Sequence, residues 1–381
     1  MRGRSSRAAG DNGTVDVLQR AGPALRIFFW SRLGLGLLAA ASVLLLDASL
    51  NPERGRWDSE RLHDVGAALD VWARWDSDWF VRIAERGYSW PSSTPAFFPL
   101  YPLLVGGLGR ALASHYVLAG LLVSLAACAV SFVLLYRLAG LRLGEEAATR
   151  AVLYLAVFPT SLFLGAVYSE SLFLALAVGC FLLAERGRLG WAAVLTGLAL
   201  LTRVQGVALL PALALFAWRS ERRGRAFALL AVPLLAFAVY PLVLGVWIDR
   251  PFAFLDAQDV WDRHLSPAGP LGGMWQATAE GDVVELMFAV VMLALGVVAW
   301  RRLGATYGLY ALGALLLPMA FPSERLGGLY SFPRFALVAF PCFIALALLG
   351  RDRRVHAAAV TVSTAALAVF VVRWALWYWV A

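Results

Sequence analysis

The chain has 381 residues, of which 61% are hydrophobic and 15% charged, and its mean hydropathy is +0.71. This composition excludes an ordinary soluble protein, and repeated apolar runs of roughly 17 to 25 residues predict a polytopic all-α membrane protein. The net charge is +8, and all 33 basic residues are arginine. Because these arginines lie in short breaks between apolar runs, where they set membrane topology, nucleic-acid binding is not expected.

The apolar runs define the domain organisation. Residues 1–23 are polar and predict a flexible cytoplasmic tail, followed by a single transmembrane domain over residues 24–381. The run 25–46 starts too late and is too long for the apolar part of a signal peptide, so we expect it to be the first span. The further expected spans, which bring the total to about 11 transmembrane helices, are 117–138, 150–167, 169–184, 189–205, 206–218, 226–248, 284–300, 305–321, 335–350 and 356–379.

The arginine-rich breaks predict the orientation of these spans. They all fall on the same side as the N-terminal tail, which is therefore expected to be cytoplasmic. All of these breaks lie on the cytoplasmic side only if residues 97–112 do not cross the membrane. We therefore expect that segment to be re-entrant or to lie on the membrane surface, within a first extracytoplasmic loop over residues 48–116. The absence of lysine and the frequent alanine, leucine, glycine and arginine suggest a GC-rich bacterial genome, so we expect a multi-pass protein of the bacterial plasma membrane. The breaks are residues 137–150, 186–188, 219–225, 301–302 and 351–354.

The first outer loop contains a stretch with two carboxylates, Trp75–Pro102. Asp76 and Asp78 precede an amphipathic helical pattern, and a proline-rich aromatic segment follows it. Asp76 could be a catalytic carboxylate, or it could simply cap the helix while Asp78 interacts with the helix dipole. Residues 57–60 repeat part of this pattern, Trp-Asp-Ser-Glu, and coincidence is the favoured explanation.

The order of motifs resembles a known family. The sequences W-D-S-D-W-F-x-x-I-A-x-x-G-Y (Trp75–Tyr88), A-F-F-P-L-Y-P (Ala96–Pro102) and Y-S-E-S-L-F (Tyr168–Phe173) are similar to those of the PIG-V-like mannosyltransferases, which belong to the GT-C glycosyltransferases. The resemblance implies a GT-C-type helical bundle and transfer of a hexose, mannose, from a polyprenyl-phosphate donor on the non-cytoplasmic face, with inversion. The acceptor would be an extracytoplasmic glycan, lipid or protein.

The resemblance also implies roles for the two carboxylates. The first-loop aspartate, Asp76, would take the proton of the acceptor hydroxyl, while Asp78 would contact the acceptor or a metal. Because the implied leaving group is a lipid monophosphate rather than a nucleotide diphosphate, a divalent ion is not expected to be obligatory, and no other cofactor is implied.

Further candidate residues belong to the outer loops and the ends of spans. Arg334 and Arg325 are candidates for the phosphate, although they could instead anchor at the interface or pair with Glu324. Each of the remaining candidates also has a non-functional explanation: an arginine that extends to the lipid headgroups, a charge at a helix end, a solvated histidine or an aromatic residue at the membrane interface. These other candidates are Glu170, Arg203, Gln205 and His264, with Trp75, Trp79, Tyr88 and Phe98 as aromatic contacts.

Two other classes of function compete with a transferase. A multi-pass transporter or lipid flippase would place ionisable groups near the bilayer midplane and show inverted repeats, whereas the carboxylates here gather in outer loops. A structural partner within an envelope-assembly complex would tolerate alanine at Asp76, Asp78 and Arg334.

Overall fold

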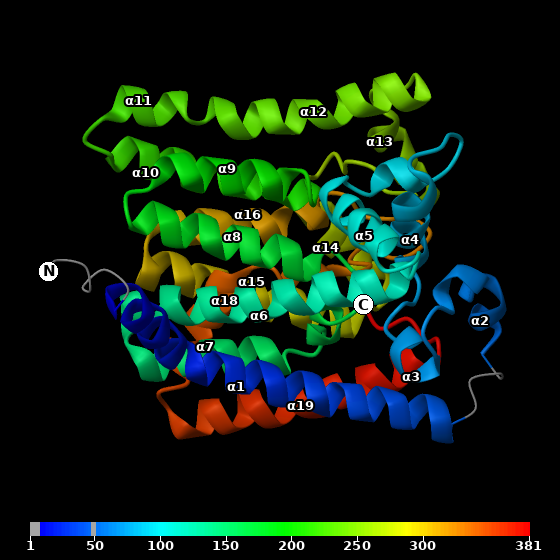
Figure 1. Ribbon diagram of the computed structural model, residues 1–381, viewed down its shortest axis with the longest axis horizontal. Coiled ribbons are helices and arrows are strands. Elements are labelled where there is room, and N and C mark those ends of the chain that lie inside the picture. The colour runs from blue at the N-terminus through cyan, green and yellow to red at the C-terminus, as the bar shows by residue number, and fades with distance from the viewer. Residues whose placement is uncertain (1–7, 47–50) are drawn as a thin grey trace, which may run out of the picture.

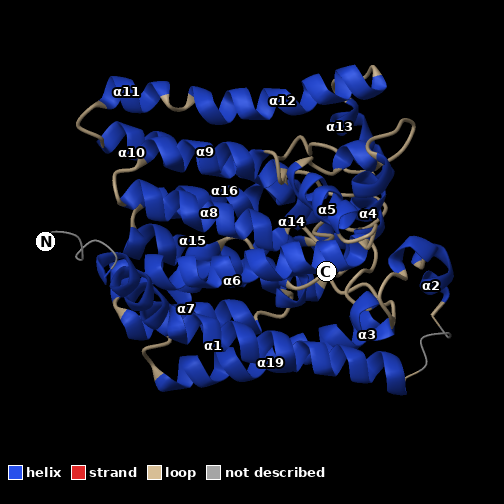
Figure 2. Ribbon diagram, viewed as in Figure 1, coloured by secondary structure: helices blue, strands red, loops and turns tan. Residues whose placement is uncertain are grey.

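The computed structural model describes residues 8–46 and 51–381. Over these residues the chain is helical and contains no β-strand beyond isolated bridges, as the all-blue ribbon of Figure 2 shows. The predicted all-α class is therefore confirmed.

A bundle of roughly parallel helices forms the body of the molecule (Figure 1). Their bounds are α1 (Ala8–Leu45), α6 (Tyr116–Leu143), α7 (Glu145–Val157), α8 (Glu170–Glu185), α9 (Leu189–Leu200), α10 (Leu209–Arg219), α11 (Arg223–Ala228) with α12 (Ala231–Ile248), α15 (Val283–Leu303), α16 (Ala305–Met319), α18 (Phe340–Leu349) and α19 (Arg353–Ala375). Each expected span overlaps at least one of these helices, but the expected span 150–167 is wrong over its second half, because α7 ends at Val157 and only a short 3-10 turn, Ser161–Leu164, follows.

Five helical segments within the described ranges are long and apolar enough to cross a membrane: Ala21–Leu45, Tyr116–Leu143, Arg223–Ile248, Val283–Leu303 and Arg353–Ala375. The chain is a multi-pass membrane protein by this criterion. The remaining apolar helices have 10–17 residues, which is shorter than the roughly 20 residues that a span usually needs. The expected total of about 11 crossings therefore stays a prediction.

The turns that carry arginine lie at one end of the bundle, on the left of Figure 1, as the break pattern predicts. Arg142, before the α6–α7 turn, donates a hydrogen bond of 2.8 Å to the carbonyl oxygen of Leu303, at the α15–α16 turn. Gly144 and Gly304 make these two turns with φ angles of 86° and 103°, in a region that residues with a Cβ rarely adopt. The short connections thus place consecutive helices antiparallel.

The opposite end of the bundle holds the short helices of the first loop. These are α2 (Pro52–Trp57), α3 (Ala67–Asp70), α4 (Ser77–Arg86) and α5 (Leu100–Ala111). At 12 residues, α5 is about 18 Å long, too short to cross a hydrocarbon core of about 30 Å. It packs so closely on α4 that a Cβ added to Gly106 would lie 2.8 Å from the carbonyl oxygen of Ala84. Because α9 and α18 in the bundle are no longer than α5, the expectation that residues 97–112 do not cross the membrane stays a prediction.

The N-terminal segment differs from the expected flexible tail. Helix α1 begins at Ala8 and includes Pro23, so residues 8–23 are helical, and residues 1–7 of the expected tail lie outside the described residues. A polar composition argues against burial but does not prevent a helix from continuing out of an apolar span.

Candidate active site

A cavity of about 690 Å³ lies at the end of the bundle that holds α2, α4 and α5. Segments far apart in the sequence contribute to it, because several helices and loops end there. Its lining comes from residues 51–57, 75–80, 96–98, 168–169, 202–205, 254–263, 317–335 and 378–379, and its charged lining residues are Glu53, Arg56, Asp76, Arg203, Arg263, Arg325 and Arg334.

Asp76 directs its carboxylate into this cavity. It occupies the position before α4, but its side chain makes no capping hydrogen bond. Instead, Oδ2 accepts a hydrogen bond of 2.6 Å from Nη1 of Arg334. The backbone N–H of Asp76 donates to the hydroxyl of Tyr168 at 3.1 Å, and the preceding Trp75 has a φ of 55°, a left-handed conformation that is uncommon for a bulky side chain. The capping alternative is therefore wrong for the side chain of Asp76.

Arg334 lies on the short helix α17 (Phe332–Ala336) and is enclosed by aromatic rings. Its guanidinium carbon is 5.4 Å from the ring centre of Tyr168 and 5.5 Å from that of Trp379. Burial opposes its charge, but Asp76 and Glu170 outweigh burial and raise the pKa of Arg334 above its ordinary value. The guanidinium therefore stays charged and holds one oxygen of Asp76 in place.

Glu170, behind the cavity lining, and Arg203, which belongs to the lining, extend this contact. Glu170, the first residue of α8, is fully buried, and its Oε1 is 2.7 Å from Nη1 of Arg203 and 3.6 Å from Nε of Arg334. Arg203 also donates to Oε1 of Gln205 at 2.9 Å. Asp76, Arg334, Glu170 and Arg203 thus alternate in sign, and we call them the ion-pair chain. Its formal charges sum to zero.

Arg263 is a cavity residue that the sequence did not single out. Its Nη2 donates to the carbonyl oxygen of Tyr330 at 2.7 Å, and its guanidinium carbon lies 5.1 Å from the ring centre of Phe335. Within the described ranges no carboxylate lies at ion-pair distance from it. Burial, and then the nearby charge of Arg334, lower the pKa of Arg263 to about 10, so at neutral pH it carries a positive charge with no carboxylate partner.

Arg325 also lines the cavity, in a more exposed position. Its Nη2 donates to the carbonyl oxygen of Val260 at 2.6 Å, and its backbone N–H donates to Oδ2 of Asp262 at 3.0 Å. Arg325 and Arg263 thus join the loop before α14 (Pro270–Glu280) to the loop before α17.

Asp78 is oriented away from the cavity. Oδ1 accepts hydrogen bonds from Ser59 at 2.5 Å and Arg61 at 2.9 Å, and Oδ2 accepts from Arg82 at 3.3 Å. It is absent from the described lining of the cavity, and these contacts favour a structural role for Asp78; its expected catalytic role stays a prediction. The Trp-Asp-Ser copy at residues 57–59 packs on the second copy, since the Trp57 and Trp75 rings are 5.6 Å apart.

Two other candidates lie outside the cavity. The His264 side chain is 61% exposed and lies near Asp262, with 3.4 Å between Nε2 and Oδ1. The Tyr88 hydroxyl donates to the carbonyl oxygen of Phe97 at 2.8 Å, and its ring packs on Tyr240. Tyr88 therefore positions the loop behind the cavity. The predicted residues that do line the cavity are Asp76, Arg203, Gln205, Arg325, Arg334, Trp75, Trp79 and Phe98.

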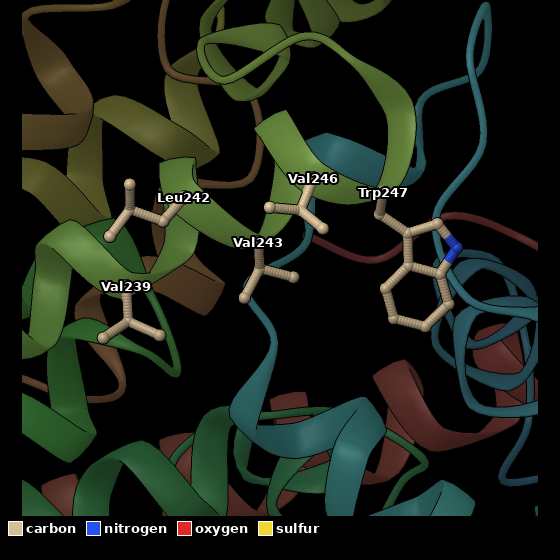
Figure 3. Close-up of a pocket in the computed structure, with 5 residues that line it drawn as sticks. All are labelled: Val239, Leu242, Val243, Val246 and Trp247. Carbon is tan, nitrogen blue, oxygen red and sulfur yellow. The ribbon is translucent and has the colours of Figure 1, made fainter.

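A second hollow lies along the outer face of α12 (Figure 3) and has a volume of about 670 Å³. It is lined by apolar residues, among them Val246 and Trp247, which are 91% and 60% exposed. Exposed apolar side chains on a long hydrophobic helix are typical of a surface that contacts lipid.

The described residues offer no cluster of three or more His, Cys, Asp or Glu side chains suited to a metal ion. Among them, the three cysteines Cys128, Cys180 and Cys342 are buried and unpaired.

Comparisons with known proteins agree with the motif pattern. Residues 48–221 match the family described as mannosyltransferase (PIG-V). A stretch of 141 residues is 36% identical to GPI alpha-1,6-mannosyltransferase 2 of Mus musculus and covers 34% of this chain and 28% of that protein. The chain thus spans less than a third of that relative's length.

Two solved structures from Archaeoglobus fulgidus also show similarity. One is an oligosaccharyltransferase crystallised with zinc and sulfate, with 13% identity and a TM-score of 0.45 over 91% of this chain and 53% of that one. The other is the oligosaccharyltransferase AglB with an inhibitory peptide and a dolichol-phosphate, with 15% identity and a TM-score of 0.41 over 91% and 55%. The predicted resemblance to the PIG-V-like mannosyltransferases is confirmed for residues 48–221, the part of this membrane protein that holds all three motifs.

Proposed function

We propose that the chain is a membrane glycosyltransferase that moves a hexose, mannose, from a polyprenyl-phosphate donor to an acceptor hydroxyl with inversion at the anomeric carbon. The observation that carries this proposal is the carboxylate of Asp76, held through Oδ2 by Arg334 inside a cavity of about 690 Å³. The family match over residues 48–221 supports mannose as the sugar.

Asp76 is suited to act as the base. Its side chain is 15% exposed, and with Oδ2 engaged by Arg334, Oδ1 is left for the acceptor. In the proposed reaction the acceptor hydroxyl gives its proton to Asp76, and its oxygen forms a bond to the anomeric carbon. The bond from that carbon to the phosphate oxygen breaks, and its electron pair leaves with the polyprenyl phosphate. One displacement inverts the carbon and needs one base.

Arg263 is suited to receive the phosphate. A polyprenyl-phosphate sugar is a phosphodiester with one negative charge, and its departure adds a second charge on the leaving phosphate. The ion-pair chain is neutral, whereas Arg263 adds a positive charge beside it. A guanidinium binds phosphate oxygens through two parallel N–H bonds. We therefore assign the phosphate to Arg263, with Arg325 as a second contact, and Arg334 to positioning Asp76 rather than to the expected phosphate site.

This assignment makes a divalent metal non-obligatory, because guanidinium groups supply the positive charge at the leaving group. The arginine-bearing turns at the opposite end of the bundle favour a cavity that opens on the extracytoplasmic face. The acceptor would therefore be an extracytoplasmic glycan, lipid or protein.

The purified chain in lipid nanodiscs should be given synthetic polyprenyl-phosphate mannose, with GDP-mannose as the matched donor control. We expect transfer from the lipid donor alone, unchanged by EDTA, with an inverted linkage by NMR. Transfer from GDP-mannose, or retention of configuration, would contradict the proposal. Uptake of lipid or sugar into vesicles without a covalent product would instead identify a transporter or flippase.

A further inference from the structure

Asp76 lies between two groups of aromatic side chains. Trp75, one residue before it, is 5.6 Å from Trp57 and 5.3 Å from Trp379, measured between ring centres. Trp79, three residues after it, is 6.1 Å from Phe97 and 6.4 Å from Trp261. The two tryptophans that flank the carboxylate thus belong to different sides of the cavity.

The side that contains Trp79, Phe97, Phe98, Phe254 and Trp261 is here called the lipid-side wall. Phe98 stacks on Phe237 of α12 with ring centres 6.3 Å apart, and Phe254 lies 6.3 Å from Phe98. Because α12 exposes a long apolar face (Figure 3), this wall continues into the surface that contacts lipid. The polyprenyl chain of the donor therefore reaches the cavity most directly from this side.

The side that contains Trp57, Trp75, Tyr330 and Trp379 is here called the tail wall. The Tyr330 and Trp379 rings are stacked, 5.4 Å apart and inclined by 16°. Residues 376–381 are fixed there by two hydrogen bonds of 3.1 Å, from the Asn51 amide to the carbonyl oxygen of Leu376 and from the Ser331 hydroxyl to the carbonyl oxygen of Ala381.

The edge of the tail wall is polar but has no net charge. Helix α2 and its cap contribute Asn51, Glu53 and Arg56 to the cavity lining, which gives one amide, one carboxylate and one guanidinium. Partly exposed aromatic rings beside donors and acceptors of both signs suit a neutral sugar ring, whose C–H face is apolar and whose hydroxyls form hydrogen bonds, although Tyr330 already stacks on Trp379 and Arg56 lies 5.5 Å from the ring centre of Trp57. An anionic ligand would find no excess positive charge among Asn51, Glu53 and Arg56, whereas the charge of Arg263 lies beside Tyr330 of the same wall.

The indole N–H groups of Trp75 and Trp379 add to this argument. Both nitrogens are buried and lack a hydrogen-bond partner among the described residues, as does the indole nitrogen of Trp79 on the lipid-side wall. A buried donor without a partner is costly, and a sugar hydroxyl would supply the missing acceptor. Both groups are shielded from solvent in this structure, so contact with a hydroxyl requires a shift of the rings.

We propose that the tail wall is the acceptor subsite and that it binds a neutral sugar ring of the acceptor against Trp57 and Trp379. The assignment rests on the proposed function, because the lipid-side wall is allotted to the donor. It places donor and acceptor on opposite sides of Asp76, so that the acceptor hydroxyl and the anomeric carbon meet at the carboxylate.

Binding measurements test this assignment without requiring turnover. The purified full chain in nanodiscs should be titrated with p-nitrophenyl α-mannoside by saturation-transfer NMR, and separately with polyprenyl phosphate. Trp379→Ala should weaken glycoside binding about tenfold, equivalent to the loss of a good stacking contact, and Trp379→Phe should restore most of it. Polyprenyl phosphate should bind Trp379→Ala normally, which also shows that the variant is folded.

A variant on the opposite wall provides the complementary result. Trp261→Ala should weaken polyprenyl phosphate about tenfold and leave glycoside binding unchanged. Trp191→Ala is the matched control, because that side chain is 64% exposed on α9 and lies outside the cavity lining. Wild-type protein that does not bind the glycoside, or glycoside binding that Trp379→Ala leaves intact or Trp261→Ala weakens equally, would overturn the assignment. If no sugar is transferred from a lipid phosphate, the proposed function fails while these titrations still decide the location of the glycoside site.

Discussion

Replacing Glu170 with glutamine should destabilise the chain by about 3–5 kcal/mol, because a buried carboxylate is removed from between two guanidinium groups. Its side chain is 0% exposed, while those of Arg203 and Arg334 are 12% and 9% exposed, so solvent screens the contacts weakly. At separations of 2.7 and 3.6 Å and an effective dielectric constant of about 20, the two attractions are about 6 and 5 kcal/mol before desolvation. Glutamine is neutral, so the variant no longer carries the free-energy cost of burying a charged carboxylate. The net loss of stability is therefore smaller than the sum of the two attractions.

Thermal unfolding of the detergent-purified chain measures this effect. A thiol-reactive dye is a suitable reporter, because Cys128, Cys180 and Cys342 are all buried in the folded state. We expect the midpoint of Glu170→Gln to fall by about 4–6 °C. Glu146→Gln is the matched control, since Glu146 is 87% exposed in its pair with Arg150 and should cost at most about 1 kcal/mol.

A second substitution tests whether the loss comes from the pairing itself. Arg203→Gln combined with Glu170→Gln removes both members of one contact and leaves Arg334 paired with Asp76. The double variant should therefore lose about 1–3 kcal/mol less than the sum of the single losses. A Glu170→Gln midpoint equal to that of Glu146→Gln, or strictly additive losses, would refute the buried ion-pair chain.

Two further predictions concern the phosphate site and the packing of the first loop. Because burial lowers the pKa of Arg263 to about 10, its charge is present below that pH and lost above it, so affinity for polyprenyl phosphate should fall as the pH rises through about 10. In titrations with polyprenyl phosphate, Arg263→Gln should bind weakly already at about pH 8, and its affinity should not fall further near about pH 10. A variant whose affinity still falls at that pH would exclude Arg263 as the source of the effect. Gly106→Ala should lower the unfolding midpoint, because its Cβ would lie 2.8 Å from the carbonyl oxygen of Ala84. Gly107→Ala, which meets nothing within 4 Å, should leave the midpoint unchanged or raise it; equal losses would contradict the α4–α5 contact.

The helical architecture could be predicted because it depends on local patterns. Apolar run length predicted the helices of the bundle, and the arginine breaks predicted which turns lie together. The extent of α1 could not be predicted in this way, because composition does not distinguish a solvated helix from a flexible tail over residues 8–23.

The candidate site could be predicted only in part, because its contacts are distant in sequence. The motif at Trp75–Pro102 placed Asp76 in the site, and the loop before residue 335 supplied Arg334, but their pairing spans 258 residues. Arg263 and Trp379 carried no local motif, and only the folded chain brings them to the cavity. The two aspartates differ in orientation because residues two apart on a helix point about 200° apart, which sends Asp78 toward Ser59 and Arg61.

The most direct test of the account is the transfer rate of Asp76→Asn with polyprenyl-phosphate mannose. Asparagine keeps the size of the side chain and an oxygen that can accept the Arg334 hydrogen bond of 2.6 Å, but it cannot take a proton. We expect kcat to fall by about 100-fold to 10,000-fold, with the unfolding midpoint falling less than that of Glu170→Gln because Arg334 keeps Glu170 as a charged partner. Asp78→Asn, which alters the other carboxylate of the same motif, should keep kcat within about tenfold of the wild type. An Asp76→Asn enzyme as active as Asp78→Asn would contradict the assignment of Asp76 as the base.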